Sequence, residues 1–124
     1  MLNQSGITTE TATTPQSILW APENAIAFSC VVAKDKKLPA GTPIAGDLTA
    51  RNTGFTAATT TGDTGAKTSN AVGLLLHEVD ASGAKQNGTV LVAGVVDLNK
   101  LDSTTAALIT AEVKAALKHI IFVK

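Results

Sequence analysis

The sequence predicts a mainly β domain with one C-terminal α-helix, an α+β fold, preceded by an extended N-terminal arm. Three observations carry this prediction. Residues 70–124 follow the pattern of an apolar strand–turn–strand–helix–strand unit, and residues 26–32 alternate large and small side chains with the period of a strand. The first 22 residues, in contrast, are rich in Thr and poor in core-forming side chains. We therefore expect an arm over residues 1–22 and a single β-rich domain over residues 23–124.

Composition and charge exclude several classes of partner. Ten Lys or Arg residues balance ten Asp or Glu residues among 124, whereas a protein that binds duplex nucleic acid or an acidic membrane needs a basic face. Three Phe, one Trp and no Tyr leave few stacking platforms for bases or sugars. No apolar run approaches the ~20 residues of a membrane span, and the N-terminus lacks the pattern of a signal peptide. We therefore expect no nucleic-acid partner, no membrane partner and a soluble protein made in the cytoplasm.

The arm has the composition of a segment that pairs with another protein. Residues 1–14 contain five Thr, with Leu2 and Ile7 as their only sizeable apolar residues, too few to offset the entropy of ordering the backbone. Because Thr favours the strand conformation, this segment is suited to adding a strand to another sheet. The candidate residues for such a contact are Ile7, Thr8, Thr9, Thr11, Thr13 and Thr14.

Three consecutive apolar residues, Ile18, Leu19 and Trp20, stand between two prolines at the end of the arm. Each proline biases the residue before it towards an extended backbone. One interpretation is that Trp20 caps the bottom of the core. The other is that these three residues anchor the arm or form a subunit contact, since Trp is favoured at the energetic centres of interfaces.

The first strand of the domain is predicted over Ile26–Val32. Its face carries Phe28, Cys30 and Val32 in the two-residue period of a strand. As the only cysteine, Cys30 has no internal disulfide partner, and its place on this face predicts a buried structural thiol.

Two connecting segments follow. Leu38–Ile44 places two prolines around a glycine, which predicts a tight turn that leads into a short strand. Residues 51–70 are rich in Thr, Gly and Ala, and Phe55 is their only large apolar residue. A long irregular loop of this kind either has a function or is disordered.

The C-terminal third is predicted to open with a hairpin. Ala71–Val79 is the first strand, buried on both faces around Leu74–Leu76, and Asn87-Gly88 is a hairpin signal. The return strand is Thr89–Leu98, with Gly94 as a bulge or a point of close approach.

One helix and a last strand complete the prediction. Asp102 or Ser103 is a suitable N-cap for a helix that runs to about Lys118, and His119–Val123 is expected to close the chain as a strand. Apolar residues at three- and four-residue spacing form the helix stripe: Ala106, Ile109, Val113, Ala116, Leu117 and Ile120.

No catalytic, cofactor or metal site is expected. The only His and Cys residues, His77, His119 and Cys30, have no metal-ligand spacing. The glycines form neither a dinucleotide fingerprint nor a phosphate loop, and no nucleophile stands in a recognisable motif with a base and an orienting acid. The chain is therefore not expected to be an enzyme.

The order of these segments resembles a known family. Leu38–Ile44, the succession Asn70–Asp80 and Gly88–Leu98, the short Ala-rich helix and the terminal Ile-Ile-Phe-Val strand are similar to head decoration and head-fibre proteins of tailed bacteriophages. The lambda-type decoration protein is the best-known relative in architecture. The resemblance implies a small barrel domain of the β-tulip or β-clip type.

The resemblance also implies a function. Such proteins assemble as homotrimers on the outer surface of the expanded capsid, at three-fold and quasi-three-fold sites, where the arm orders against the major capsid protein. The implied location is therefore the virion, and the implied role is to stabilise the head against internal DNA pressure, without a cofactor.

An alternative is a carbohydrate- or ligand-binding β-clip module. Leu38–Ile44, followed by Asp47-Leu48, is similar to a turn in the antifreeze-like family of such domains. The scarcity of aromatic residues weighs against sugar stacking.

Overall fold

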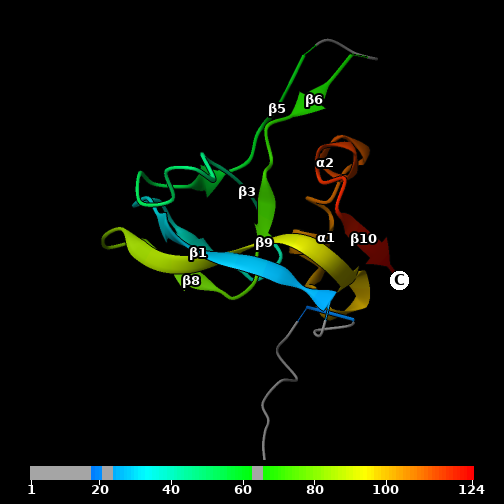
Figure 1. Cartoon of the computed structure of the whole chain (residues 1–124), viewed down its shortest axis with the longest axis horizontal. Helices are drawn as coiled ribbons and strands as arrows, with labels where there is room; N and C mark the ends of the chain where they lie inside the picture. Colours follow the sequence, from blue (N-terminus) through cyan, green and yellow to red (C-terminus); the bar gives the residue numbers. More distant parts are fainter. Residues whose placement is uncertain (1–17, 21–23, 63–65) are drawn as a thin grey trace, which may run out of the picture.

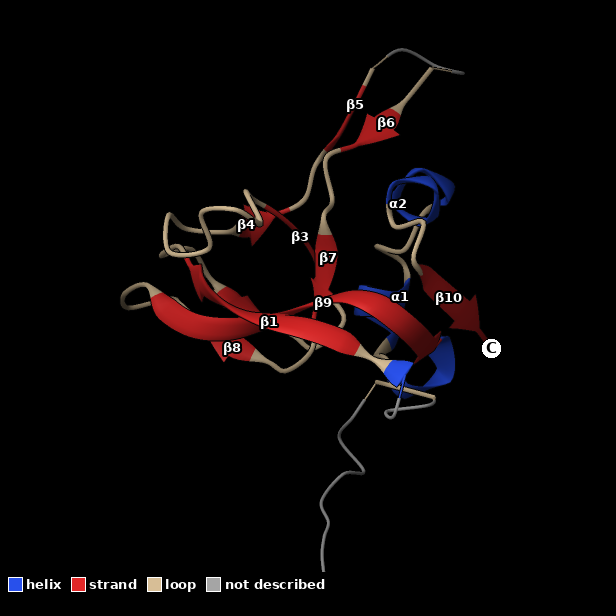
Figure 2. Ribbon diagram, in the orientation of Figure 1, coloured by secondary structure: helices blue, strands red, loops and turns tan. Residues whose placement is uncertain are grey.

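The computed structural model describes residues 18–20, 24–62 and 66–124. Within these residues the chain is mainly β with few helices, as Figures 1 and 2 show, and this part of the fold prediction is confirmed. The described sheets do not close into a barrel. The expected barrel is therefore wrong: its strands form one open sheet and two small ribbons.

The main sheet is built around one long strand, β9 (Gln86–Asp97), which runs across the centre of Figure 1. Its order is β1 (Ile26–Val32), β9, β7 (Gly73–Leu75), β3 (Pro43–Ala45) and β4 (Thr56–Ala57), and β10 (Ile120–Val123) also pairs with β9. The two ribbons are β2 (Lys37–Leu38) with β8 (Val79–Asp80), and β5 (Thr60–Thr61) with β6 (Thr68–Ser69).

A β-bulge on β9 changes which of its side chains share a face. Ile26 pairs with Ala93 and Ala27 with Leu91, so Val92 is an extra residue on β9. Two residues further on, Gly94 has φ +143°, and a methyl group added there would lie 3.3 Å from the Cα of Ala25. The close approach that the sequence predicts at Gly94 is confirmed.

The two faces of the sheet are covered by two separate cores. Consecutive residues divide between them: Leu74 and Leu91 belong to one core, and Leu75 and Val90 to the other. The predicted burial on both faces is thus confirmed for Leu74 and Leu75. We call the first the helix-side core; its buried members are Ile18, Leu19, Ala71, Leu74, Leu91, Val96, Leu101, Ile109, Val113, Leu117 and Ile120. The second, the loop-side core, contains Cys30, Val32, Leu38, Ile44, Phe55, Leu75, Val79, Ala81 and Val90.

The predicted antiparallel pairing of the two strands is confirmed, because Leu74 and Leu75 of β7 pair with Leu91 and Val90 of β9, but the predicted turn at Asn87-Gly88 is wrong. Both residues lie inside β9, where Asn87 pairs with Val31 and Gly88 with Cys30 of β1. The predicted strand Ala71–Val79 is divided into β7 and β8, and β8 pairs with β2 instead of continuing beside β9. Hydrogen bonds to β1, which is distant in sequence, outweigh the local preference of Asn-Gly for a turn.

The single predicted helix is also wrong, because two short helices take its place. Helix α1 (Ser103–Ala106) begins at Asp102, whose carboxylate accepts a hydrogen bond from the backbone N–H of Thr105, as the N-cap prediction requires. Thr110 has extended backbone angles and caps the second helix, α2 (Ala111–Ala116). Its hydroxyl accepts from the backbone N–H of Val113, so this polar side chain competes with continuation of the first helix. A 3₁₀ turn, η4 (Leu98–Lys100), precedes both.

The segment 51–70 is more ordered than the sequence indicates. It contributes β4, β5 and β6, while its residues 63–65 lie outside the description. Phe55 lies in the loop-side core with no exposed surface, and its backbone bonds on both sides: its N–H donates to Val31 and its carbonyl accepts from Ala33. The aromatic ring therefore ties the start of this segment to β1.

Candidate functional site

The predicted contact residues of the arm, from Ile7 to Thr14, lie outside the described residues. The described chain starts at Ile18, so Ile18, Leu19 and Trp20 show how the end of the predicted arm joins the domain.

Ile18 and Leu19 lie in the helix-side core. Ile18 is 1 % exposed, and its carbonyl accepts a hydrogen bond from the N–H of Asp97 at 2.9 Å. Leu19 forms an antiparallel bridge with Val96, and its carbonyl accepts from Nζ of Lys100 at 3.0 Å. The residue pair thus joins the arm to the end of β9 by both backbone and side chain.

The side chain of Trp20, unlike those of Ile18 and Leu19, faces solvent. Its N–H donates to the carbonyl of Val95 at 2.8 Å, which continues the bridge, but the side chain is 64 % exposed. The interpretation that Trp20 caps the core is therefore wrong, because side chains alternate across a strand and Leu19 already takes the buried side. The role of arm anchor or subunit contact stays a prediction.

Trp20 belongs to a larger exposed set that sequence reasoning did not identify. The Leu19–Val96 bridge puts Trp20 beside Val95, and Val95 pairs with Ile121 of β10. Next along the sheet, Ile26 pairs with Ala93. We call these five residues, Trp20, Ile26, Ala93, Val95 and Ile121, the outer apolar face. Their sequence signal is weak, because the bulge at Val92 determines which β9 residues join them.

A cleft of about 590 Å³ lies between the turn after β2 and the helices. This volume falls within the ~300–1,000 Å³ of small-molecule sites. Apolar residues make up much of its lining, with Lys36 and Lys37 also on its wall; the apolar set is Leu38, Pro39, Pro43, Ala57, Ala58, Ala107, Leu108 and Val113. The cleft thus includes part of the Leu38–Ile44 turn that the sequence singles out.

One polar atom near this cleft lacks a hydrogen-bond partner within the described chain, the Oγ1 of buried Thr105. It does not indicate a missing ligand, because the same hydroxyl helps to stabilise the Asp102 carboxylate. The backbone N–H of Thr105 has the larger effect, and both lower the pKa of Asp102.

Cys30 is buried, as the sequence predicts. Burial raises the pKa of its thiol, and the nearby Arg51 guanidinium offsets only part of this effect. The thiolate is the nucleophilic form, so the environment disfavours reaction at Cys30. The structure therefore assigns this residue a place in the loop-side core.

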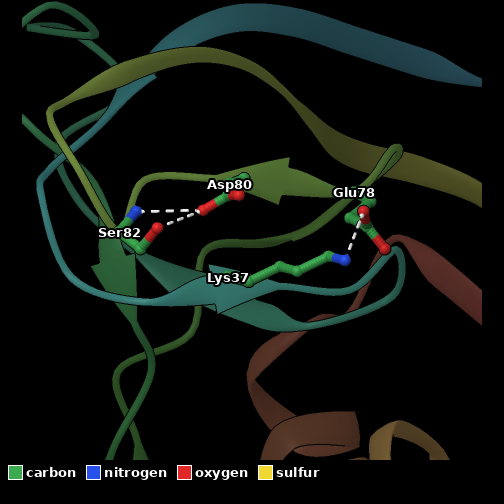
Figure 3. Close-up of polar contacts among 4 residues, drawn as sticks. All are labelled: Lys37, Glu78, Asp80 and Ser82. Atoms are coloured by element: carbon green, nitrogen blue, oxygen red, sulfur yellow. Dashed lines mark hydrogen bonds and ion pairs between the residues drawn. The ribbon is translucent and has the colours of Figure 1, made fainter.

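The polar residues around the β2–β8 ribbon, drawn in Figure 3, form turns and a surface ion pair. Lys37 Nζ lies 3.4 Å from Glu78 Oε2, with both side chains more than half exposed. Asp80 accepts from the backbone N–H of Ser82 at 3.1 Å and from its hydroxyl at 2.6 Å (Figure 3). Within the described residues, no group of three or more His, Cys, Asp or Glu side chains is placed to hold a metal ion.

Acid is expected to destabilise the protein through its capping carboxylates. Hydrogen bonds to the ionised form lower the pKa of Asp47, Asp80 and Asp102 below the ordinary 3.8. Carboxylates with a depressed folded-state pKa contribute stability above the unfolded-state value, and that stability is lost as the pH falls through the folded-state value. The melting temperature should therefore fall between about pH 5 and pH 2.

Asp102→Asn provides the matched control, because Asn caps a helix about as well as Asp but does not titrate. Its melting temperature should fall less steeply with acid than that of the wild type. Asp102→Ala, which has no cap, should melt lower throughout the neutral range. Equal acid dependence of the wild type and Asp102→Asn would contradict the assignment of Asp102.

Comparison of the chain with protein-family models and with curated proteins gives no match. None of the helices in the described part of the chain is long and apolar enough to cross a membrane.

Proposed function

We propose that this protein is a capsid decoration protein of a tailed bacteriophage. It binds as a homotrimer to the outer surface of the expanded head, at three-fold and quasi-three-fold sites, and its partner is the major capsid protein. Within this proposal the domain is an open member of the β-tulip or β-clip type, and its location is the virion.

The observation that carries the proposal is the attachment of the Thr-rich arm. The chain enters the fold through Ile18 and Leu19, which are buried in the helix-side core and bonded to the end of β9. An arm that pairs with a capsid strand transmits its load to this point. Because β9 pairs with β1, β7 and β10, the load is shared by most of the main sheet.

The energetics of a clamp agree with this arrangement. Packed DNA presses outward on the shell, and a protein that contacts several capsid subunits adds favourable free energy only to the expanded state. Each arm contact is allowed to be weak, because the arms of one trimer bind with an effective concentration set by their tethers. The arm should therefore contribute far more to capsid binding than any single surface charge does.

Deletion of residues 1–14 is expected to leave the domain folded and to abolish binding to the capsid. The domain keeps Ile18, Leu19 and both cores, while the strand-forming segment is lost. The measurement is co-sedimentation with empty capsids from the protein's own source, in compact and expanded forms, together with a thermal melt of the truncated protein. Saturable binding of the wild type to the expanded form alone is the expected reference.

Two controls sharpen this test. Thr9→Pro with Thr11→Pro keeps the length of the arm but removes backbone donors, and it should bind as poorly as the deletion. Lys85→Ala changes one exposed charge and should bind normally. Normal binding by the truncated protein would contradict the role of the arm, and no binding by the wild type would contradict the decoration function itself.

The cleft favours a second candidate, a ligand-binding β-clip module. Its volume is suitable for a small molecule, and it includes Leu38, Pro39 and Pro43. No aromatic residue is among the described residues that line it, so it suits an aliphatic ligand better than a sugar. Binding of such a ligand would survive loss of the arm and would respond to changes around Pro39, which separates the two functions.

A further inference from the structure

The outer apolar face brings three of the exposed large apolar side chains of the described chain together around the partly exposed Ala93 and Val95. Trp20 is 64 %, Ile26 53 % and Ile121 61 % exposed. Single exposed apolar residues are ordinary on protein surfaces, but a contiguous patch marks an interaction site. Strand register makes this patch contiguous, because paired residues on neighbouring strands place their side chains on the same face, about 4.5–5.5 Å apart.

The packing of the domain explains why this part of the sheet stays uncovered. On one side of β9, the helices cover Leu91 and Val96 with the helix-side core. On the other side, the loop-side core covers Val90 and the second half of β1 but ends before Ile26. The side chains of Ala93 and Val95 lie on the same side of the sheet as the loop-side core, but beyond the part of β9 that this core covers.

The strands at the margins of this face are also open. Both β1 and β10 pair with β9 alone among the described strands. Segment 51–55 covers the outer edge of β1 at Val31 but not at Ile26. Neither strand contains a charged residue or a proline, the usual devices by which proteins block edge-to-edge association.

We propose that the outer apolar face is the surface through which copies of this chain meet, and that its occupant is a second copy. The proposal rests on the homotrimer of the proposed function, in which the three faces converge on the three-fold axis, so that each face contacts those of its two neighbours. A second copy brings an equally apolar and uncharged face, so no charge is desolvated. The arm is a poorer occupant, because Met1, Leu2 and Ile7 are its only sizeable apolar residues before position 15.

The size of the face determines how tight the contact is. Even a fully buried aromatic side chain contributes only about 150–250 Å², and the face has one partly exposed Trp and two partly exposed Ile residues as its large members, so it exposes a few hundred Å² at most. One partner in a standard interface contributes about 800 Å². The face by itself therefore joins copies weakly, and arms held on a shell convert this weak contact into a stable one by raising the effective concentration.

The test is sedimentation velocity of the full chain from micromolar to millimolar concentration. The wild type should self-associate, and Ile121→Lys should weaken association at least tenfold, because it puts a charge into the apolar contact. Leu108→Lys is the matched control: Leu108 is an exposed aliphatic residue, like Ile121, but lies at the cleft, so association should be unchanged. Thermal melts should show that both variants fold, since neither residue is buried, and Trp20→Ala replaces Ile121→Lys if that variant fails to fold.

Three results would overturn the proposal. One is a wild type that remains monomeric at millimolar concentration, and another is equal association of the wild type, Ile121→Lys and Trp20→Ala. The third is normal self-association of Ile121→Lys with loss of capsid co-sedimentation, which would assign the face to the capsid protein. Because wild-type capsid binding is measured separately, failure of the decoration function is distinguished from failure of this inference.

Discussion

Replacement of Phe55 by alanine is expected to lower the free energy of unfolding by about 3–5 kcal/mol, the usual cost of removing a buried aromatic side chain. Phe55 has no exposed surface and is a large residue of the loop-side core. It also packs against the backbone, because a methyl group added at Gly46 would lie 2.7 Å from the ring. A loss of this size is a large part of the stability of a typical domain. Urea denaturation followed by circular dichroism measures it.

Phe28→Ala is the matched control. Phe28 lies on β1 with its ring substantially exposed, and the Arg51 guanidinium is 5.4 Å from the ring centroid. Its removal should cost less than removal of Phe55, because 42 % of its surface stays in water in the folded domain. Equal losses in the two variants would mean that Phe55 does not hold segment 51–55 against β1.

Ile18→Ala is expected to lower the free energy of unfolding by about 2–5 kcal/mol, as for other buried aliphatic residues. Ile18 is 1 % exposed and belongs to the helix-side core, although it lies in a stretch that the sequence assigns to the arm. Chemical denaturation of Ile18→Ala and Trp20→Ala side by side gives the comparison. Trp20→Ala should melt close to the wild type because its side chain faces solvent.

Comparison of Ile18→Ala with Trp20→Ala separates the anchoring of the arm from the association of copies of the chain. If Ile18 only stabilises the domain, Ile18→Ala should weaken capsid binding only to the extent that it unfolds the domain, and binding should recover at low temperature; if Ile18 also anchors the arm, binding should stay weak when the domain is folded. A melt of Ile18→Ala indistinguishable from that of the wild type would contradict its place in the core. The ratio of the two effects therefore reports on the difference in burial between Ile18 and Trp20 at the start of the fold.

Local signals in the sequence determined several elements correctly. The two-residue period predicted β1, the carboxylate before Ser103 predicted the start of α1, and the prolines around Gly41 predicted a turn that leads into β3. In each case the decisive interactions lie within a few residues. Gly41 has φ +92° and Thr42 bonds back to Pro39, so the turn is specified by its own residues.

Tertiary structure alone decided the rest. Asn87-Gly88 extends as strand because β1 pairs with it, and Phe55 orders its segment because a core is available to receive the ring. The outer apolar face depends on a bulge at Val92 and on pairings between segments distant in the chain, such as Ile26 with Ala93 and Leu19 with Val96. These outcomes depend on long-range hydrogen bonds and burial, which outweigh local propensities of a few tenths to one kcal/mol. Such contacts are not encoded in the neighbourhood of any one residue, and the whole chain must fold before they exist.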